Sequence, residues 1–426
     1  MKPFIVASTR PELIKLSPVM RELEARGIGY IFVTTGQHYD EPLFDRFISD
    51  LELREPDYDV EVGSGSQAYQ TSLAMMELEK LMAEEKPDVV VAEGDTNSVL
   101  SSALAAVKLH IPFAHVEAGL RSFDKRMPEE VNRILADHCS ELLFAPTDGA
   151  GLNLINEGIF PDKIFIVGNT IVDATLQNLK LANKMPSKLP EGYLLLTLHR
   201  AENVDKYEVL SGIVDALIEI KQKIIFPVHP RTKKMLEKFK LIEKLKKGNI
   251  SIVEPMGYLD FLNAMSSADL VLTDSGGIQE EAVTLKVPCL TLRTTTERPE
   301  SVDAGGNILA GVKKEDILEK LQLILGDRKL YDKMKQTRNP FGDGKAGKRI
   351  VDILVEKHDK DELRIPSPDF TKGFWKKRFV EIDSELDGKR IRELDFMVLR
   401  VIDKSEERFP HSDMKLKKGQ MIELIS

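Results

Sequence analysis

The sequence predicts an α/β protein made of two Rossmann-like units with parallel sheets, followed by a small α+β domain. Short, continuously apolar runs alternate with longer amphipathic segments, a pattern typical of buried parallel strands separated by helices. This rhythm stops at a polar, proline-containing stretch at residues 184–192 and then begins again. The chain has 426 residues. Because an ordinary domain has roughly 150 residues, two or three domains are expected.

The first unit holds six strand candidates. Residues 4–7 are the first, and apolar side chains at three- and four-residue spacing after them predict a helix. A second helix is predicted over residues 98–109. The remaining strand candidates are residues 30–34, 88–92, 113–116, 142–145 and 164–167. Because these runs are largely apolar, we expect a parallel sheet with both faces covered by helices.

The second unit repeats the pattern. Its strand candidates are residues 193–198, 224–228, 250–253, 270–273 and 289–292. Helices are predicted over residues 209–221 and from Gln279 onward. Two units of this kind in one chain usually enclose a ligand near the carboxyl ends of their strands.

These patterns predict the domain boundaries. We expect Rossmann-like domains at residues 1–170 and 171–355, then a charged, proline-bearing linker at residues 356–374. Residues 375–426 are expected to form the small α+β domain. Its strand candidates are residues 379–382, 398–402 and 421–425.

Composition indicates a globular protein inside the cell. Hydrophobic residues make up 42% and charged residues 30%, which is ordinary for a globular chain. The formal net charge of −9 disfavours nucleic acid, whose phosphates reward a basic surface. Cys139 and Cys289 match no metal-ligand spacing, and we expect two reduced thiols. With neither a signal peptide nor an apolar run of about 20 residues, the sequence predicts a cytoplasmic protein without membrane segments.

In parallel sheets, functional side chains gather just after the strands. Arg10 and Lys15 follow the first strand, where they could hold an anion together with the helix N-terminus. The alternative is that both are surface cations. Asp95 follows the third strand and is placed to point into a cleft, although it could instead cap the next helix.

Glu117 closes a largely apolar run, so its carboxyl group is expected at the end of a buried strand. Burial raises a carboxyl pKa, as a general acid or base at neutral pH requires. The alternative is a buried ion pair with Arg121. Glu129 and Glu130 follow Pro128 at the start of a predicted helix, where they could serve chemistry or only the helix dipole. Together, the carboxylates on these successive loops, at Asp95, Glu117 and the Glu129–Glu130 pair, favour proton transfer.

The second unit offers an anion site. His199 follows a strand whose end should face the cleft, while His229, between two prolines, could be packing. The run Ser275-Gly276-Gly277 joins a strand to a helix, so that exposed N–H groups and the positive helix end could hold a diphosphate. Glu281 is spaced to accept hydrogen bonds from ribose hydroxyls, and Arg298 is a further candidate ligand.

At these residues the sequence resembles the non-hydrolysing UDP-N-acetylglucosamine 2-epimerases. The resemblance spans about residues 1–355. Its matching runs, in order, are residues 8–12, 35–38, 94–96, 115–121, 128–133, 168–170, 273–281, 295–300 and 339–344.

The resemblance implies a GT-B-like fold, a homodimer, and neither metal nor NAD. It implies interconversion of UDP-GlcNAc and UDP-ManNAc for surface polysaccharides. In the implied mechanism the C2 proton is removed and UDP is expelled, leaving a 2-acetamidoglucal. UDP then re-adds while a proton reaches the opposite face of C2.

The same resemblance assigns roles by motif. It implies that the acid/base carboxylates are Asp95, Glu117 and Glu129, and that His199 is the cleft histidine. The implied UDP-contacting residues are Arg10, Lys15, Phe261, Ser275, Gly276, Gly277, Glu281 and Arg298.

Three positions depart from the family pattern. Ser8 stands where a glycine is common, and Met256 where a glutamine near the uracil is frequent. Residues 39–43 replace a bacterial run that helps to hold a second, activating UDP-GlcNAc. The resemblance therefore does not extend to activation by substrate.

Residues 375–426 lie outside that family. Runs at residues 386–394, 398–402, 410–413 and 416–424 resemble the C-terminal module of RCK-type potassium-channel regulators. This resemblance implies a dimerisation or regulatory domain that can bind a small-molecule effector.

Three other functions share parts of this pattern. A hydrolysing epimerase would release UDP and free ManNAc, and a GT-B glycosyltransferase would need an acceptor site. A nucleotide-sugar sensor is suggested by the appended domain. The three carboxylates of the first unit favour proton chemistry over sugar transfer.

Overall fold

The computed structural model describes residues 1–36, 47–184, 189–365, 377–394, 397–403, 406–411 and 414–425. The chain divides into two compact units. Unit 1 comprises Met1–Thr170 together with Gly344–Ser426, and unit 2 comprises Ile171–Asp343. Among the described residues, no helix is long and apolar enough to cross a membrane.

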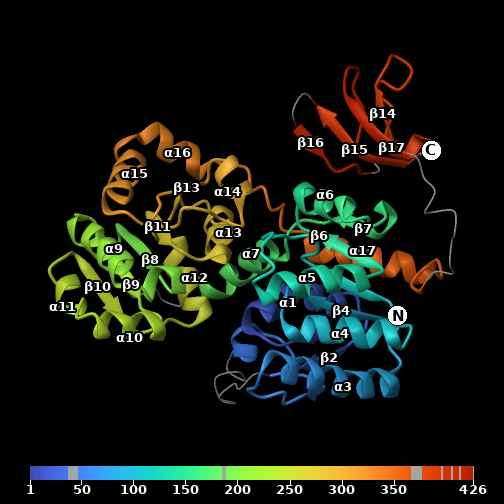
Figure 1. Cartoon of the computed structure of the whole chain (residues 1–426), viewed down its shortest axis with the longest axis horizontal. Helices are drawn as coiled ribbons and strands as arrows, with labels where there is room; N and C mark the ends of the chain where they lie inside the picture. Colours follow the sequence, from blue (N-terminus) through green and yellow to red (C-terminus); the bar gives the residue numbers. More distant parts are fainter. Residues whose placement is uncertain are drawn as a thin grey trace. The chain divides into compact units, whose positions relative to one another are not determined.

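Unit 1 contains a seven-stranded parallel sheet in the order β3-β2-β1-β4-β5-β6-β7. Strands β2, β4, β6 and β7 of this sheet are labelled in Figure 1. Its strands are β1 (Pro3–Ala7), β2 (Ile31–Thr34), β3 (Tyr58–Asp59), β4 (Val89–Glu93), β5 (Phe113–Val116), β6 (Leu142–Ala145) and β7 (Ile164–Ile166). Every residue of β1, β2, β4, β5 and β6 is buried, as expected for apolar strands covered on both faces. The six predicted strands are confirmed, and the two-residue β3 is an addition.

Helices follow the strands of unit 1. They are α1 (Arg10–Ala25), α3 (Gln67–Glu85), α4 (Asn97–Lys108), α5 (Pro128–Cys139), α6 (Asp148–Asn156) and α17 (Ala346–Asp359), with a short 3-10 turn, η1 (Pro161–Lys163). Thr9 caps α1 and accepts from the N–H of Glu12, whose carboxylate accepts from the N–H of Thr9. This reciprocal cap starts α1 directly after β1.

Unit 2 repeats the architecture with a six-stranded parallel sheet in the order β10-β9-β8-β11-β12-β13. The strands are β8 (Tyr193–Thr197), β9 (Lys223–Pro227), β10 (Ile250–Val253), β11 (Leu270–Thr273), β12 (Cys289–Thr291) and β13 (Asn307–Leu309). The helices are α7 (Thr170–Ala182), α8 (Ala201–Val204), α9 (Tyr207–Glu219), α10 (Pro230–Lys238), α11 (Ile242–Leu245), α12 (Tyr258–Ser266), α13 (Gly276–Thr284), α14 (Pro299–Asp303), α15 (Lys314–Gly326) and α16 (Arg328–Lys335). The two predicted Rossmann-like sheets are therefore confirmed.

In each sheet the strand order reverses once. The chain of unit 1 runs outward from β1 to β3 and then returns to β4 on the other side of β1. Unit 2 does the same with β8 and β11. The loops after such a pair of strands lead in opposite directions and leave space for a ligand at the carboxyl end of the sheet. The fold therefore predicts ligand sites at the carboxyl ends of β1 and β4 in unit 1, and of β8 and β11 in unit 2.

Helix α17 lies in unit 1, although the predicted second domain ran to residue 355. A Cβ at Gly347 would lie 2.8 Å from the carbonyl carbon of Pro18 in α1. Arg26, at the end of α1, forms an ion pair of 2.6 Å with Asp352. The glycine permits a close approach of the two helices that the sequence pattern does not reveal.

The last part of unit 1 is a four-stranded antiparallel sheet in the order β14-β17-β15-β16, here called the C-terminal module. Its strands are β14 (Lys377–Glu381), β15 (Met397–Asp403), β16 (Glu406–Arg408) and β17 (Met421–Ile425), with a 3-10 turn, η3 (Ile391–Glu393). Its own core contains Ile382, Val398, Val401, Leu416, Ile422 and Leu424. The described part of the module is thus a sheet with a separate core.

The close contact of α17 with α1 predicts the effect of Gly347→Ala. The added Cβ should overlap the backbone of Pro18 and lower the free energy of unfolding by about 1–3 kcal/mol. Lys348→Ala, at the exposed next position, should change it by less than about 0.5 kcal/mol. Denaturant unfolding measures both. Equal stability of Gly347→Ala and the parent would contradict this packing.

Candidate functional site

The turn after β1 is organised by the buried carboxylate of Glu12. It accepts hydrogen bonds from the backbone N–H groups of Ser8 and Thr9 and from the Ser8 hydroxyl. Burial raises the pKa of Glu12, while these hydrogen bonds and one from Thr96 oppose the rise. The guanidinium of Arg10 lies 5.5 Å from the centre of the Phe47 ring. The conformation of this turn is therefore fixed by the hydrogen bonds of Glu12.

Lys15 lies between two buried carboxylates. Its Nζ is 2.8 Å from Oε1 of Glu93 and 2.6 Å from Oε2 of Glu117. The side chains of Glu93 and Glu117 are 2% and 6% exposed, and that of Lys15 is 14% exposed. We call these three residues the carboxylate cluster. Lys15 is thus a largely buried partner of two carboxylates, which overturns the alternative that it is a surface cation.

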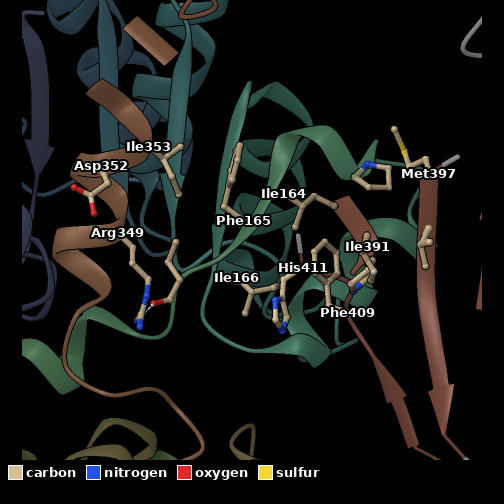
Figure 2. Close-up of a pocket in the computed structure, with 14 residues that line it drawn as sticks. Ile164, Phe165, Ile166, Arg349, Asp352, Ile353, Ile391, Met397, Phe409 and His411 are labelled. Atoms are coloured by element: carbon tan, nitrogen blue, oxygen red, sulfur yellow. Dashed lines mark hydrogen bonds between the residues drawn. The ribbon is translucent and has the colours of Figure 1, made fainter. Parts of the chain in front are cut away.

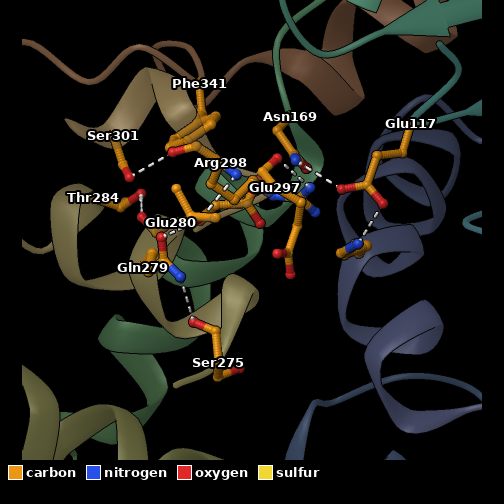
Figure 3. A network of polar contacts seen from close by, with 12 residues as sticks. Glu117, Asn169, Ser275, Gln279, Glu280, Thr284, Glu297, Arg298, Ser301 and Phe341 are labelled. Atoms are coloured by element: carbon orange, nitrogen blue, oxygen red, sulfur yellow. Dashed lines mark hydrogen bonds and ion pairs between the residues drawn. The ribbon is translucent and has the colours of Figure 1, made fainter. Parts of the chain in front are cut away.

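A proton is readily retained in the carboxylate cluster. Burial raises the pKa of Glu93 well above its ordinary value, Lys15 opposes the rise, and the neighbouring Glu117 adds to it. The amide of Asn169 donates to Oε1 of Glu117 at 2.9 Å (Figure 3). Two carboxyl groups that share one cation in a dry site can hold and pass on a proton, as acid–base chemistry requires.

A buried network holds the loop that carries Glu117. Nδ1 of His115 is 2.6 Å from Oδ1 of Asp137, and its Nε2 is 2.8 Å from the carbonyl oxygen of Gly94. Because a carboxylate and a carbonyl both accept, both ring nitrogens donate and the imidazole is charged. Burial alone would lower the pKa of His115, but Asp137 outweighs it and the shift is upward.

Asp137 extends this network along the loop. Its Oδ2 accepts from the N–H of Gly119 at 3.1 Å and pairs with Arg121 at 2.7 Å. Arg121 also binds Glu157, so the predicted alternative of a Glu117–Arg121 pair is not what forms. Glu117 itself has a φ of 69°, a conformation that is uncommon for residues other than glycine. The network therefore holds Glu117 in a strained position.

Asp95 lies at the end of β4 and is half-buried. Its Oδ2 is 2.5 Å from Nη2 of Arg133 on α5. Thr96, not Asp95, caps α4 and accepts from the N–H of Val99. The alternative that Asp95 serves as a helix cap is therefore wrong.

The two acids at the start of α5 differ in environment. Glu130 is buried and accepts from the N–H groups of Ser122 and Phe123 and from Arg133. Burial alone would raise the pKa of Glu130, but these hydrogen bonds outweigh it and the pKa is lowered. Glu129 is exposed. Glu130 thus holds the loop, and Glu129 is the acid open to a ligand.

In unit 2 the buried Asp274 organises the turn after β8. Its carboxylate accepts from the N–H groups of His199 and Arg200 and from the amide of Asn203. Nδ1 of His199 lies 3.3 Å from Oδ1 of Asp274, while 41% of the His199 side chain is exposed. Nδ1 of His229 accepts from the N–H of Arg231 at the start of α10. His199 is therefore oriented by Asp274, and His229 is a helix cap.

The N-terminus of α13 is open. Ser275 occupies the capping position but makes no side-chain capping hydrogen bond, and the first turn has no acid. A Cβ at Gly277 would meet nothing within 4 Å, whereas one at Gly276 would lie 2.6 Å from Oε1 of Glu297. Uncapped N–H groups and the positive end of a helix form an anion site.

Two guanidinium groups offset the charge of Glu297 near this helix. Arg200 pairs with its Oε1 and Arg293 with its Oε2. Burial alone would raise the pKa of Glu297, but the two cations outweigh it and lower the pKa to about 2. The surroundings of α13 therefore remain compatible with an anion.

The other predicted ligands of unit 2 have partners. The hydroxyl of Tyr258 donates to Glu281 at 3.1 Å. Arg298 pairs with the buried Glu280 at 2.7 Å (Figure 3). Phe261 is half-buried beside the core of unit 2. Among the described residues, no group of three or more His, Cys, Asp or Glu side chains could hold a metal ion.

Several members of these networks were not selected as site residues from the sequence. They are Glu93, Asn169, Asp274, Tyr258 and Glu280. Glu93 and Asp274 had a readable signal, since each is an acid at the end of an apolar strand. Residues 37–46 lie outside the described residues. They include the second half of the matched run 35–38 and the whole departure at 39–43.

Comparison with known proteins finds similar sequences. The sequence model of the family described as UDP-N-acetylglucosamine 2-epimerase matches residues 21–355. A UDP-N-acetylglucosamine 2-epimerase from Methanocaldococcus jannaschii is 53% identical over 368 residues, which cover 83% of this chain and 99% of that protein. A UDP-2,3-diacetamido-2,3-dideoxy-D-glucuronate 2-epimerase from Pseudomonas aeruginosa is 40% identical and covers 84% of this chain and 100% of its own length.

Solved structures of similar proteins have a similar fold. The Methanocaldococcus jannaschii UDP-GlcNAc 2-epimerase in complex with UDP-GlcNAc and UDP has a TM-score of 0.75 at 52% identity, covering 84% of this chain and 100% of that one. The UDP-GlcNAc 2-epimerase from Neisseria meningitidis bound to UDP-GlcNAc has a TM-score of 0.76 at 34% identity, with the same coverage. The family match ends at residue 355, before the C-terminal module begins.

The different surroundings of Glu129 and Glu130 predict different effects of their amide variants. Glu130→Gln should lower the free energy of unfolding at neutral pH by about 1–3 kcal/mol, because it weakens buried charge-assisted hydrogen bonds. Glu129→Gln, at an exposed position, should change it by less than about 0.5 kcal/mol.

The pH dependence follows from the lowered pKa of Glu130. Its stabilisation is present above the ordinary glutamate pKa and is lost as the pH falls through the lower folded value. The difference between the parent and Glu130→Gln should therefore shrink on acidification, as measured by unfolding at several pH values. A constant difference would contradict the assignment.

Proposed function

The chain belongs to the UDP-N-acetylglucosamine 2-epimerase family, and we propose that it interconverts UDP-GlcNAc and UDP-ManNAc without releasing the free sugar. The observation that carries this proposal is the carboxylate cluster of unit 1. Removal and return of a proton at C2 need groups that exchange protons near neutral pH. The raised pKa of Glu93 beside Glu117 is suited to that task.

Three carboxylates are proposed to act on the proton at C2: Asp95, Glu117 and Glu129. Asp95 lies in the loop after β4, Glu117 in the loop after β5, and Glu129 in the first turn of α5, all at the carboxyl end of one sheet. Asp95 is held by Arg133 and Glu117 by Lys15 and Asn169, so each has a fixed orientation. Epimerisation needs proton transfer on both faces of C2, and more than one carboxylate can supply it.

Unit 2 is proposed to bind the UDP portion. The open N-terminus of α13, with Ser275, Gly276 and Gly277, fits a diphosphate. Further proposed ligands from the family motifs are Phe261, Glu281 and Arg298 of unit 2, with Arg10 and Lys15 of unit 1. His199, oriented by Asp274, is proposed to act near the leaving diphosphate.

The cluster also suggests what Lys15 does. Its ammonium already compensates two carboxylates, so we propose that it sets their protonation in addition to any contact with the nucleotide. When the C2 proton is taken up by one carboxyl group, Lys15 can shift toward the other. In this proposal, an anionic substrate that contacts Lys15 also changes the protonation of the two carboxyl groups.

Two further proposals concern the assembly of the enzyme and its C-terminal module. We propose that the enzyme is a homodimer that supplies UDP-ManNAc for surface polysaccharides. We propose that the C-terminal module, for which the sequence suggested an RCK-like domain, regulates or dimerises the enzyme. Its separate core and its position beyond residue 355 support a role outside the chemistry.

Amide variants test the proposed carboxylates. Asp95→Asn, Glu117→Gln and Glu129→Gln should each lower turnover by about 10²–10⁴-fold while UDP binding changes little, because general acid–base groups act mainly in the transition state. Incubation with UDP-GlcNAc in D₂O, followed by NMR, measures deuterium at C2.

The same experiment separates the alternative functions. Deuterium gain at C2 with UDP still attached supports epimerisation. Free UDP with ManNAc would indicate a hydrolysing enzyme, and no change without an acceptor would indicate a transferase or sensor. Turnover within about threefold of the parent in all three variants would refute the acid–base assignment.

Gly277→Ala tests the proposed diphosphate site. Its Cβ would lie in open space, so the fold should tolerate the change and α13 could gain up to about 1 kcal/mol. Close approach of phosphate should be blocked, and loss of charge-assisted hydrogen bonds should weaken UDP binding by about 10–150-fold. Calorimetric titration with UDP measures this.

Gly212→Ala is the matched control. Gly212 lies in helix α9 of the same unit, where an added Cβ would make an ordinary contact at 3.8 Å with the carbonyl oxygen of Val312. UDP affinity should stay at the parent value. Gly276→Val is less informative because its side chain would meet Glu297. If Gly277→Ala bound UDP as tightly as the parent, the diphosphate would have to lie elsewhere.

A further inference from the structure

A pocket of about 470 Å³ lies within unit 1, between the edge strand β7 and the C-terminal module (Figure 2). On one side it is lined by Ile164, Phe165 and Ile166 of β7. On the other side Met397 and Val398 of β15 line it. Its volume falls in the range of sites that hold a small organic molecule, roughly 300–1,000 Å³.

The lining is mostly apolar, with few polar groups. Arg349 and Asp352 of α17 reach the pocket, and His411 follows β16 into it (Figure 2). Asp352 is compensated by two cations, with Arg26 at 2.6 Å and Lys348 at 2.8 Å. The other ionisable side chains of the lining are Arg349, which also donates to the carbonyl oxygen of Val167, and His411. A guanidinium group beside an apolar surface suits an anionic group on an apolar body.

The segment from β7 to Asn169 connects the pocket to Glu117. Strand β7 ends at Ile166, and Val167, which also lines the pocket, accepts from Arg349 at 3.0 Å. Two residues later Asn169 donates to Oε1 of Glu117 at 2.9 Å. A shift of β7 or of Arg349 would therefore move the amide that orients this carboxylate.

A second path runs through α6. Phe409 lines the pocket and packs in a buried cluster with Ala118, Ala150 and Leu154. A Cβ at Gly119 would overlap the carbonyl oxygen of Ala150, so α6 lies directly against the residue two positions after Glu117. The module is thus packed against the back of the loop that carries Glu117.

We propose that this pocket binds a small apolar or aromatic anion, and that its occupation changes how Glu117 is held and thereby the activity. The binding site stands on the pocket itself. The effect on activity rests on the proposed role of Glu117. The two parts can be measured separately.

The binding test uses the intact chain and 8-anilinonaphthalene-1-sulfonate, an aromatic anion, with UDP present in excess to occupy nucleotide sites. Calorimetry should show one saturable site per chain. N-phenyl-1-naphthylamine, the uncharged counterpart, should bind more weakly. Absence of a saturable site, or tighter binding of the uncharged compound, would overturn the proposal.

A pocket-filling variant locates the site. Ile391 of η3 lines the pocket, and Ile391→Trp should weaken binding of the sulfonate by about tenfold or more, because the larger side chain occupies the space. Phe379→Trp, on the exposed face of β14 in the same module, is the matched control and should bind as the parent does. Should Ile391→Trp fail to fold, Met397→Trp fills the same pocket from β15. Unchanged binding in a folded filling variant would place the ligand elsewhere.

The coupling test has a structural and a kinetic readout. Saturation with the sulfonate should change hydrogen–deuterium exchange in the segments 115–121 and 164–170 and alter turnover by about fivefold or more. Both effects should vanish in Ile391→Trp. Binding in the pocket without either effect would overturn the coupling. An inactive chain that still shows the exchange change would refute the proposed function and leave the site and its coupling standing.

Discussion

The ammonium of Lys15 between Glu93 and Glu117 is the interaction on which the candidate active site depends. Two carboxylates buried side by side repel each other and lose their hydration, and the cation offsets both costs. This arrangement requires α1 to start directly after β1, which the cap formed by Thr9 and Glu12 ensures. It also requires β4 and β5 to lie in sequence beside β1, as the sheet order provides. The cap, the strand order and the acid–base group are therefore parts of one constraint.

Unit 2 presents backbone N–H groups where its strand order reverses. Its sheet reverses between β8 and β11, as that of unit 1 does between β1 and β4. The buried Asp274 at the end of β11 holds the turn after β8 through its N–H groups. The helix that follows Asp274 then begins without a side-chain cap. One unit thus concentrates titratable side chains at its reversal point, and the other leaves helix N–H groups open there. Proton transfer needs the first arrangement and a diphosphate needs the second.

The sequence predicted the sheets well because apolar runs and strand spacing are local signals. It located the loops that carry Asp95, Glu117 and Ser275 for the same reason. The pairings within the site were less accessible, because Lys15 and Glu117 are separated by 102 residues and Asn169 and Glu117 by 52. Periodicity also cannot distinguish Glu129 from the adjacent Glu130, since burial depends on how α5 packs. The position of α17 depends on close packing at Gly347, which no local pattern encodes.

The C-terminal module packs close to residues that hold the strained backbone of Glu117. A positive φ at a residue other than glycine costs about 1–3 kcal/mol and persists only where the surroundings hold it. Here the support comes from Asn169, from the network around Asp137, and from α6 behind Gly119. Two of these three supports, the segment after β7 and α6, lie where the module packs. The central strands are locked by neighbours on both sides, whereas β7 is an edge strand with one neighbour in its sheet. A domain added at this edge can therefore act on Glu117 without disturbing the sheet that holds the rest of the site.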